Sequence, residues 1–338
     1  MDLFQLTRSL IDIDSVTGSE RRIGDFLFEH LSRLSGGTVE RMPVAADRFN
    51  VFAAWGEPAV VLSTHMDTVP PFFPSFEDSV HIHGRGACDT KGIIAAMLTA
   101  AAEMLAGGTR GFGLLFVVGE ETDSAGAQVA ERMAGRLARG SRFLINGEPT
   151  ENRLALGSKG ALYLKVEAEG TAAHSAYPEL GVSAIDRLLA ALARLREVPL
   201  PGDPVLGETT LNIGTLRGGR APNVVADAAG AEVMIRTVGD TAELKEKLAA
   251  AVAAIDGVRI AETRETRAMR LGSLPGFETT VVKYTSDIPR LPSWGAPFLL
   301  GPGSIHAAHT PHERVAKAEL TAAVRLYQEM VRRLQTNA

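Results

Sequence analysis

Three unbroken apolar runs stand out in the first half of the chain, at residues 59–62, 114–118 and 143–145. Continuous runs of this kind are typical of strands that are buried on both faces, as in parallel sheets. Segments with helical spacing of their apolar residues lie between the runs, at residues 91–105 and 127–139. The alternation predicts an α/β domain in which helices flank a mainly parallel central sheet.

Further helices are expected at both ends of the chain. The first thirty-odd residues predict two helices, the second of which opens at Ser19 and Glu20 and ends at Gly36-Gly37. A last helix is expected at residues 317–334.

The pattern changes near Gly157, where apolar and polar residues begin to alternate. The order that follows is strand, helix, strand, strand, helix and strand, which predicts an α+β, ferredoxin-like domain of the split βαβ type. The six elements are expected at residues 161–167, 182–196, 210–216, 231–238, 242–255 and 258–263.

Composition narrows the class of protein without naming it. The 338 residues suffice for two domains, or for one large domain with an insertion. A net charge of −5 and the lack of a basic face argue against a nucleic-acid partner. The longest apolar stretch, around residues 93–102, is too short to span a membrane, so no membrane partner is expected. The single Cys88 excludes an internal disulfide and no signal pattern follows Met1, so we expect a cytoplasmic protein.

Side chains that bind metal ions recur along the chain, several of them at the ends of the predicted strands. In chain order they are His65, Asp67, Asp89, Glu120, Glu121, Glu148 and His309. An α/β sheet binds its ligands at the carboxyl ends of its strands. Two imidazoles and three carboxylates can hold two divalent cations with one carboxylate shared, an arrangement that suits metal-assisted hydrolysis.

Each of these side chains also has an ordinary structural interpretation. His65 and Asp67 can belong to a polar loop after a buried strand, and Asp89 can cap the helix that follows it. Adjacent glutamates such as Glu120 and Glu121 are common on surfaces. Their joint placement favours one shared site over separate explanations.

Four motifs carry a resemblance to a known family. His65-Met66-Asp67, residues 84–92, Gly119-Glu120-Glu121 and Gly147-Glu148-Pro149 resemble motifs of the M20 metallopeptidases. That family includes acetylornithine deacetylase, succinyl-diaminopimelate desuccinylase and related carboxypeptidases and aminoacylases. The resemblance covers nearly the whole chain, including the middle domain.

The resemblance implies two divalent metal ions, with zinc expected and cobalt or manganese as alternatives. His65 would bind one ion and His309 the other, while Asp89 would bridge them. Glu121 and Glu148 would each complete the coordination of one ion. A cis peptide after Asp89 is also typical of the family.

The family also implies roles around the metal ions. Glu120 would be the general base that activates water and later protonates the leaving amine. Asp67 is expected to accept the other ring N–H of His65. His174 would hydrogen-bond the oxyanion, either within its own chain or across a dimer interface.

Substrate binding is expected at residues from both domains. Asn223 and Arg236 resemble residues that hold the substrate, and the loop containing Gly303 and Ser304 would receive the substrate carboxylate together with Arg236. The resemblance further implies a homodimer formed through the middle domain, which would also act as a lid.

Because His309 joins this site, we expect one discontinuous catalytic domain formed by residues 1–156 and 269–338. Residues 157–268 would be the inserted lid and dimerisation domain. His306 and His312 compete with His309 for the last ligand position, but the Ala-His-x-Pro pattern favours His309. His81 and His83 resemble a metal-binding pair, although they are expected at a strand edge.

The resulting main hypothesis is a zinc-dependent amidohydrolase that removes the acyl group from an N-acyl amino acid, as acetylornithine deacetylase does in amino-acid biosynthesis. The nearest alternative is an exopeptidase, either a carboxypeptidase or a dipeptidase, on the same scaffold. A catalytically silent metal-binding scaffold protein is a third alternative, which the presence of Glu120 and all five ligands argues against.

Overall fold

The structure, a computed structural model, describes residues 2–336 and divides into two compact units, each treated separately below. Unit 1 takes in the described parts of Met1–Leu156, Leu271–Thr280 and Ser286–Ala338, and unit 2 comprises Gly157–Arg270 and Val281–Thr285. The sequence analysis predicts that the catalytic domain resumes at residue 269. In the structure, unit 2 extends to Arg270 and also includes the five residues Val281–Thr285.

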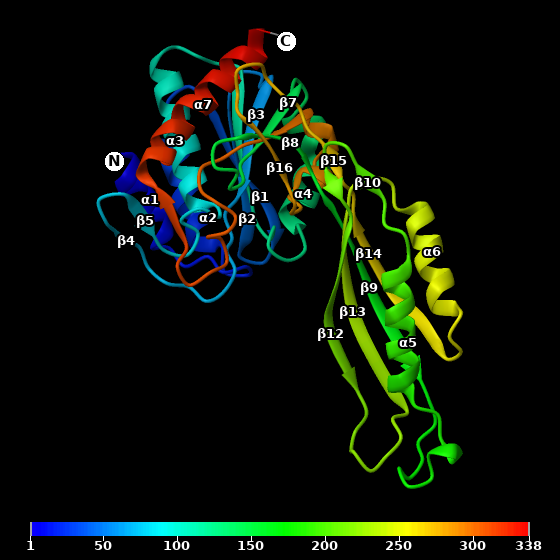
Figure 1. The fold of residues 1–338 in the computed structure, drawn as a ribbon. Coiled ribbons are helices and arrows are strands. Elements are labelled where there is room, and N and C mark those ends of the chain that lie inside the picture. The colour runs from blue at the N-terminus through cyan, green and yellow to red at the C-terminus, as the bar shows by residue number, and fades with distance from the viewer. Residues whose placement is uncertain (1, 337–338) are drawn as a thin grey trace. The chain divides into compact units, whose positions relative to one another are not determined.

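A six-stranded sheet in the order β1-β2-β6-β3-β7-β17 forms the centre of unit 1 (Figure 1). Its strands are β1 (Thr38–Ala45), β2 (Arg48–Trp55), β3 (Val60–His65), β6 (Phe112–Val117), β7 (Phe143–Asn146) and β17 (Ala296–Leu299). The last four in sheet order run parallel, and β1 and β2 form an antiparallel hairpin at one edge. All residues of β3 and β6 are buried, which explains the apolar runs at residues 60–62 and 114–117.

Helices cover both faces of this sheet. They are α1 (Leu3–Ile11), α2 (Arg21–Ser32), α3 (Lys91–Ala106), α4 (Ala125–Leu137) and α7 (Lys317–Thr336). The large apolar core joins one face to α1, α2, α3 and α7, whereas a smaller core joins the other face to α4 and Trp294. The predicted α/β class is therefore confirmed, with helices flanking a mainly parallel sheet.

Two features of unit 1 differ from the prediction. The hairpin of β1 and β2 was not predicted, because β1 is an edge strand whose residues are mostly exposed or half-buried and lack a clear apolar alternation. The second helix ends at Ser32, four residues before the predicted end at Gly36-Gly37. Glu20, at its start, accepts two hydrogen bonds from Arg48 at 2.8 and 2.6 Å.

Unit 2 is built on a four-stranded antiparallel sheet in the order β12-β13-β9-β14. The strands are β9 (Gly160–Glu169), β12 (Thr210–Gly218), β13 (Ala228–Thr237) and β14 (Val258–Thr266), and the helices are α5 (Ala184–Glu197) and α6 (Ala242–Ala253). The element order is the predicted one, and the strand order is that of a ferredoxin-like sheet. Both helices pack on one face of the sheet, so the other face is left without a helix (Figure 1).

Short elements complete the chain. They are β4 (Phe76–Glu77), β5 (His81–His83), β8 (Leu154–Ser158), β10 (Gly202–Asp203), β11 (Gly207–Glu208), β15 (Met269–Arg270), β16 (Thr279–Val282), β18 (Arg314–Ala316), and the 3-10 helices η1 (Pro178–Leu180), η2 (Ile288–Arg290) and η3 (Pro292–Trp294). Among the described residues, no helix is long and apolar enough to span a membrane.

Candidate active site

His65 is the last residue of β3 and is almost completely buried. Its Nδ1 lies 3.0 Å from the main-chain oxygen of Asp67 and 3.5 Å from the Asp67 carboxylate. A carbonyl oxygen only accepts, so Nδ1 carries the proton and Nε2 is left to bind a ligand. We expected the carboxylate of Asp67 to accept this N–H, but the main-chain oxygen of Asp67 is the nearer acceptor.

The carboxylate of Asp67 has a different task. It accepts hydrogen bonds from the main-chain N–H groups of Glu120 at 3.1 Å and Glu121 at 3.3 Å, and from the Thr17 hydroxyl at 2.7 Å. Burial opposes its charge, but these donors and His65 outweigh burial and lower the pKa of Asp67. Asp67 thus fixes the turn that presents the Glu120-Glu121 pair.

Asp89 lies two residues before the start of α3 and does not cap the helix. The N-cap is Thr90, and the peptide bond between the two residues is cis. One carboxylate oxygen of Asp89 lies 3.0 Å from Nε2 of His65, and the other lies 3.2 Å from Nε2 of His309. Asp89 therefore offers one oxygen to each imidazole, as a bridging ligand must.

A buried ion pair holds the main chain at Asp89. Glu313 accepts hydrogen bonds from the N–H groups of Cys88 at 3.3 Å and Asp89 at 3.2 Å, and its other oxygen pairs with Arg85 at 2.6 Å. Both side chains of the pair are at most 2% exposed. We did not identify Glu313 from the sequence; its only signal is its position four residues after His309, next to β18.

His309 and Glu121 form the second side of the site. Nε2 of His309 lies 3.0 Å from the Glu121 carboxylate. Hydrogen bonds with Asp89 and Glu121 raise the pKa of His309 to about 10. The backbone φ of His309 is 63°, in the left-handed region that non-glycine residues seldom adopt and that often marks a functional position.

Glu148 follows β7, is buried, and accepts a 3.4 Å hydrogen bond from Asn146. Ligand atoms of His65, Asp89 and Glu148 all lie within 4.8 Å of one another, and the same holds for Asp89, Glu121 and His309. The structure therefore brings all five predicted ligands together as two groups that share Asp89.

Negative charge exceeds positive charge in this part of unit 1. The carboxylates are those of Asp67, Asp89, Glu120, Glu121, Glu148 and Asp287, against the imidazoles of His65 and His309. Burial, together with neighbouring carboxylates, raises the pKa of Glu120 and of Glu148 well above the usual value. Such an excess of buried carboxylates is favourable only if cations or protons balance it.

Asp287 is a residue that the sequence reasoning missed. It is 2% exposed, and neither carboxylate oxygen has a hydrogen-bond partner of normal geometry among the described residues. Burial raises its pKa to about 6, and its charge contributes to the raised pKa of Glu120 and Glu148. It lies in a short loop before η2, where no local pattern distinguishes it from any other polar loop residue.

The donor atoms fit two divalent cations. Zinc binds imidazole nitrogen and carboxylate oxygen at about 2.0–2.2 Å, which leaves ligand atoms roughly 3–4 Å apart. The separations of 3.0–3.2 Å between the histidines and the carboxylates are of this size. The Asp287 carboxylate, which has no hydrogen bond of normal geometry among the described residues, adds buried negative charge that a pair of cations would offset.

Unit 2 places His174 and Asn223 side by side. His174 forms a β-bridge with Val224, and Ser175 N–H donates to the Asn223 carbonyl at 3.0 Å. Nδ1 of His174 accepts a 3.1 Å hydrogen bond from Ala176 N–H, so in the neutral ring the proton is on Nε2. Both His174 and Asn223 are exposed, which leaves a ring N–H donor free to meet a ligand.

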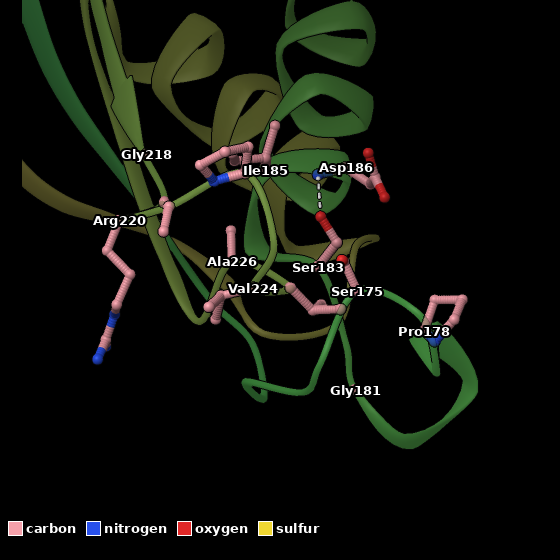
Figure 2. Close-up of a pocket in the computed structure, with 14 residues that line it drawn as sticks. Ser175, Pro178, Gly181, Ser183, Ile185, Asp186, Gly218, Arg220, Val224 and Ala226 are labelled. Carbon is pink, nitrogen blue, oxygen red and sulfur yellow. Dashed lines mark hydrogen bonds between the residues drawn. The ribbon is translucent and has the colours of Figure 1, made fainter.

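Ser175 and Val224, the residues that follow these two in the chain, line a hollow of about 890 Å³ in the loops at one end of unit 2. Figure 2 shows its lining, including Ser175, Pro178, Val224 and Arg220, whose partner is Asp227. The hollow is open to solvent, and the loops belong to two segments joined by the β-bridge at His174.

Arg236 lies at the other end of β13. From Ala228, where the strand begins near these loops, to Arg236 is eight residues of extended chain, or roughly 26 Å. The Arg236 side chain is half-buried on the sheet face without helices, burial lowers its pKa, and no partner is recorded for it among the described residues. The predicted substrate ligands of unit 2 thus occupy two places, not one.

Gly303 and Ser304 already have partners within unit 1. Gly303 N–H donates to Glu319 at 3.1 Å, and the Ser304 hydroxyl donates to Glu151 at 2.8 Å. Gly303 has φ of 86°, and a Cβ there would lie 2.4 Å from the Cβ of Cys88. Close packing of this loop against the segment before Asp89 explains the glycine, and the role of both residues in substrate binding stays a prediction.

An α/β sheet whose carboxyl edge gathers two overlapping groups of metal ligands beside Glu120 defines a metal-dependent hydrolase of peptide or amide bonds. The profile of Peptidase family M20/M25/M40 matches residues 61–333, and the chain belongs to this family. Members of the family are typically dinuclear metal enzymes.

Individual relatives agree with this assignment. A peptidase M20 domain-containing protein of Schizosaccharomyces pombe is 39% identical over 98% of this chain and 84% of its own length. A probable carboxypeptidase of Aspergillus terreus is 38% identical over 96% of this chain and 84% of its own length. The crystal structure of a tripeptidase from Staphylococcus aureus has the same fold, with a TM-score of 0.81, 22% identity, and coverage of 98% of this chain and 97% of that chain.

Proposed function

We propose that this protein is an exopeptidase of the carboxypeptidase type, which releases the C-terminal residue of short peptides. The observation that carries the proposal is the two groups of ligands sharing Asp89 beside Glu120, since they supply what hydrolysis of an amide needs. The choice of a peptide over an N-acyl amino acid follows the relative from Aspergillus terreus, whose name is that of a carboxypeptidase. This choice puts the exopeptidase ahead of the deacylase that the sequence favoured.

Two divalent cations, with zinc the first choice, would be held by His65, Asp89, Glu121, Glu148 and His309. When bound, the ions would polarise the scissile carbonyl and make water more acidic. Asp89 is placed to serve both ions, because each of its oxygens faces a different histidine.

Glu120 is the group that we assign to proton transfer. Burial and neighbouring carboxylates raise its pKa, which suits a residue that takes a proton from the attacking water and then gives it to the leaving amine. Glu120 belongs to neither group of ligands, so its carboxylate is free for this task. Asp67 positions it by accepting its main-chain N–H.

His174 and Asn223 would act on substrate bound by a second copy of the chain. A dipeptide is much shorter than the roughly 26 Å that separate Arg236 from the strand end near these two residues, so one chain's unit 2 cannot hold one substrate with both. β12 is an edge strand with no buried residue, and its free edge suits pairing between two copies. In such a homodimer, Arg236 of one chain and His174 of the other would complete each site.

Arg236 would bind the free carboxylate of the substrate. Its guanidinium is half-buried and has no recorded partner within residues 2–336, and a carboxylate can accept two parallel hydrogen bonds from it. A free carboxylate is present both in a peptide with a free C-terminus and in an N-acyl amino acid. The deacylase is therefore the second candidate, favoured by the likeness of the Gly301–Ser304 segment and His309 to the terminal motif of that group.

Product analysis on four matched substrates tests the proposal. These are an N-blocked dipeptide with a free C-terminus, the same dipeptide as its C-terminal amide, an unblocked tripeptide, and N-acetyl-ornithine. We expect release of the C-terminal residue from the first and third substrates and little or none from the amide. Cleavage from the amino end, with the amide tolerated, would overturn the carboxypeptidase assignment, and a preference for N-acetyl-ornithine would restore the deacylase.

Glu120→Gln is the matched control for this experiment. It should keep both metal ions and lose roughly 10²- to 10⁴-fold in kcat, the usual contribution of a general base. Wild-type turnover in this variant would refute the role of Glu120, whichever substrate is preferred.

A further inference from the structure

A second place in unit 1 brings together side chains that bind metal ions. His81 and His83 are the first and last residues of β5, the central strand of the sheet β18-β5-β4, so their side chains lie on one face. Asp78 lies in the turn before the strand. One ligand atom from each of these three residues lies within 4.8 Å of the other two, and none of the three belongs to the active-site groups.

The carboxylate of Asp78 lies between the two imidazoles. One oxygen is 2.9 Å from Nε2 of His83, and the other is 3.9 Å from Nδ1 of His81. Nearby cations contact other oxygens than the Asp78 carboxylate. Glu77 pairs with both Arg8 at 2.9 Å and Lys317 at 2.7 Å, and Lys317 also donates to the main-chain oxygen of Asp78 at 2.7 Å. In the described part of the chain, the two histidines are thus the only side-chain partners recorded for the Asp78 carboxylate.

The side chains of Asp78 and His83 are held in place before any ion binds. Asp78 accepts hydrogen bonds from the N–H groups of Val80 and His81, both at 2.7 Å, and its own N–H donates to the His81 carbonyl at 3.1 Å. The ring of Phe76 stacks on His83 with centroids 4.2 Å apart and planes 6° apart. Phe76 is otherwise 58% exposed, so this exposed aromatic ring serves mainly to fix the His83 ring. Ligands that are already ordered lose less entropy on binding.

We propose that Asp78, His81 and His83 form a third metal site, which binds one divalent transition-metal ion such as Zn²⁺ and leaves at least one coordination position to water. Two imidazole nitrogens and one carboxylate oxygen are a ligand set that zinc accepts together with water. The side chains are 51%, 32% and 15% exposed, so the ion reaches the site directly from solvent. We expect this site to be weaker than the buried pair of sites.

The position of the site gives it a structural role. β5 continues within six residues to Asp89, and it pairs with β18, which begins directly after Glu313. An ion held by Asp78, His81 and His83 would therefore stabilise the pair of strands β5 and β18. Asp89 follows the first of these strands, and Glu313 directly precedes the second. A ligand that binds only the folded state stabilises it by mass action.

Counting bound zinc tests the proposal without any peptide substrate, so its failure is distinct from failure of the proposed function. Chelator-treated protein is dialysed against a series of free Zn²⁺ concentrations, and bound zinc per chain is measured by mass spectrometry. We expect about three ions per wild-type chain and about two in His81→Gln/His83→Gln. Equal zinc content in both proteins across the series would overturn the proposal.

Asp89→Ala isolates the site, because it removes the shared ligand of the active site. In that background we expect one remaining ion to be lost, or its affinity to fall by at least about 10-fold, when His81 and His83 are also changed to Gln. Zinc should raise the Tm of Asp89→Ala and leave the Tm of the triple variant unchanged. If both proteins bind zinc alike, the site does not exist.

Phe76→Leu is the matched control. It removes the stacked ring and keeps all three ligands, so it should retain the third ion with weaker affinity. Equal Tm values of wild type and His81→Gln/His83→Gln in chelator would show that misfolding does not cause the loss of the ion in the double variant. A lower Tm of the double variant in chelator would assign the histidines to packing and count against the metal site.

Discussion

In unit 1 the five candidate ligands come from segments that span His65 to His309, yet their ligand atoms form two groups within 4.8 Å. In unit 2 the three candidate residues come from the much shorter stretch between His174 and Arg236. His174 and Asn223 nevertheless lie in loops near the start of β13, and Arg236 lies near its other end. Distance along the sequence therefore says little about distance in space. Parallel strands gather their carboxyl ends at one edge, whereas a long antiparallel strand separates what lies at its two ends.

The two units also differ in whether their candidate site residues have hydrogen-bond partners. Neighbouring residues hold parts of the unit 1 site in place. Asn146 donates to Glu148, Glu313 accepts from the main chain of Asp89, and Thr17 donates to Asp67 beside the Glu120-Glu121 turn. His174 and Asn223 are exposed, and no partner is recorded for the Arg236 side chain in the described part of the chain. Unit 1 thus has its candidate metal ligands already assembled, whereas the residues of unit 2 are those that we propose meet substrate or a second chain.

The strongest test of the unit 1 site is Asp89→Ala. Asp89 is the ligand common to both groups, so its loss should release metal from both and reduce turnover by more than about 10⁴-fold. Zinc content and kcat measure the effect. Asp25→Ala, which removes a half-exposed carboxylate paired with Arg41, should change neither. Retention of both ions and wild-type turnover by Asp89→Ala would refute the shared site.

The next largest effect is expected for His174→Ala. Loss of one oxyanion donor usually costs about 10²- to 10³-fold in kcat, and metal content should not change. Mixing His174→Ala with Asp89→Ala under subunit exchange should restore part of the activity, because one site of the hybrid dimer is intact. No restoration after proven exchange would mean that His174 acts within its own chain. His306→Ala, at another exposed histidine, should remain active.

Arg236→Ala should raise KM more than it lowers kcat. Hydrogen bonds to charged groups contribute about 1.5–3 kcal/mol, which corresponds to roughly 10- to 150-fold in affinity. The loss should vanish for the C-terminal amide, which lacks the carboxylate. A loss that is equal for the acid and the amide would show that Arg236 does not bind the carboxylate. Arg264→Ala, which removes an arginine stacked on Tyr163, is the control.

The smallest effect concerns Asp287 and the stability of unit 1. Burial raises the pKa of Asp287 to about 6, so the folded state holds a proton that the unfolded state releases at lower pH. This group therefore makes folding less favourable as pH rises from about 4 to about 6, and the penalty persists above that range. In chelator-treated protein, Asp287→Asn should raise Tm by a few degrees at pH 8 and have no effect near pH 4. A lower Tm of Asp287→Asn than of wild type at pH 8 would show that the Asp287 carboxylate stabilises the folded state, which would contradict this prediction.

Much of unit 1 follows from local sequence. Apolar runs such as Val60–Leu62 predicted buried strands because residues buried on both faces must be apolar. The hairpin of β1 and β2 escaped prediction because its outer strand is stabilised by pairing with its neighbour more than by burial. Asp287 and Glu313 escaped because only their distant partners distinguish them from other loop carboxylates.

The sequence by itself determined the α/β class, the element order of unit 2 and the five candidate ligands, because periodicity and short motifs are local properties of a chain. Only the tertiary structure decided that Asp89 faces both histidines, that Asp67 serves the Glu120-Glu121 turn, and that His174 and Arg236 lie far apart on unit 2. Each of these depends on which segments the sheets bring side by side. That choice is made by packing and strand pairing over the whole domain, and no single segment encodes it.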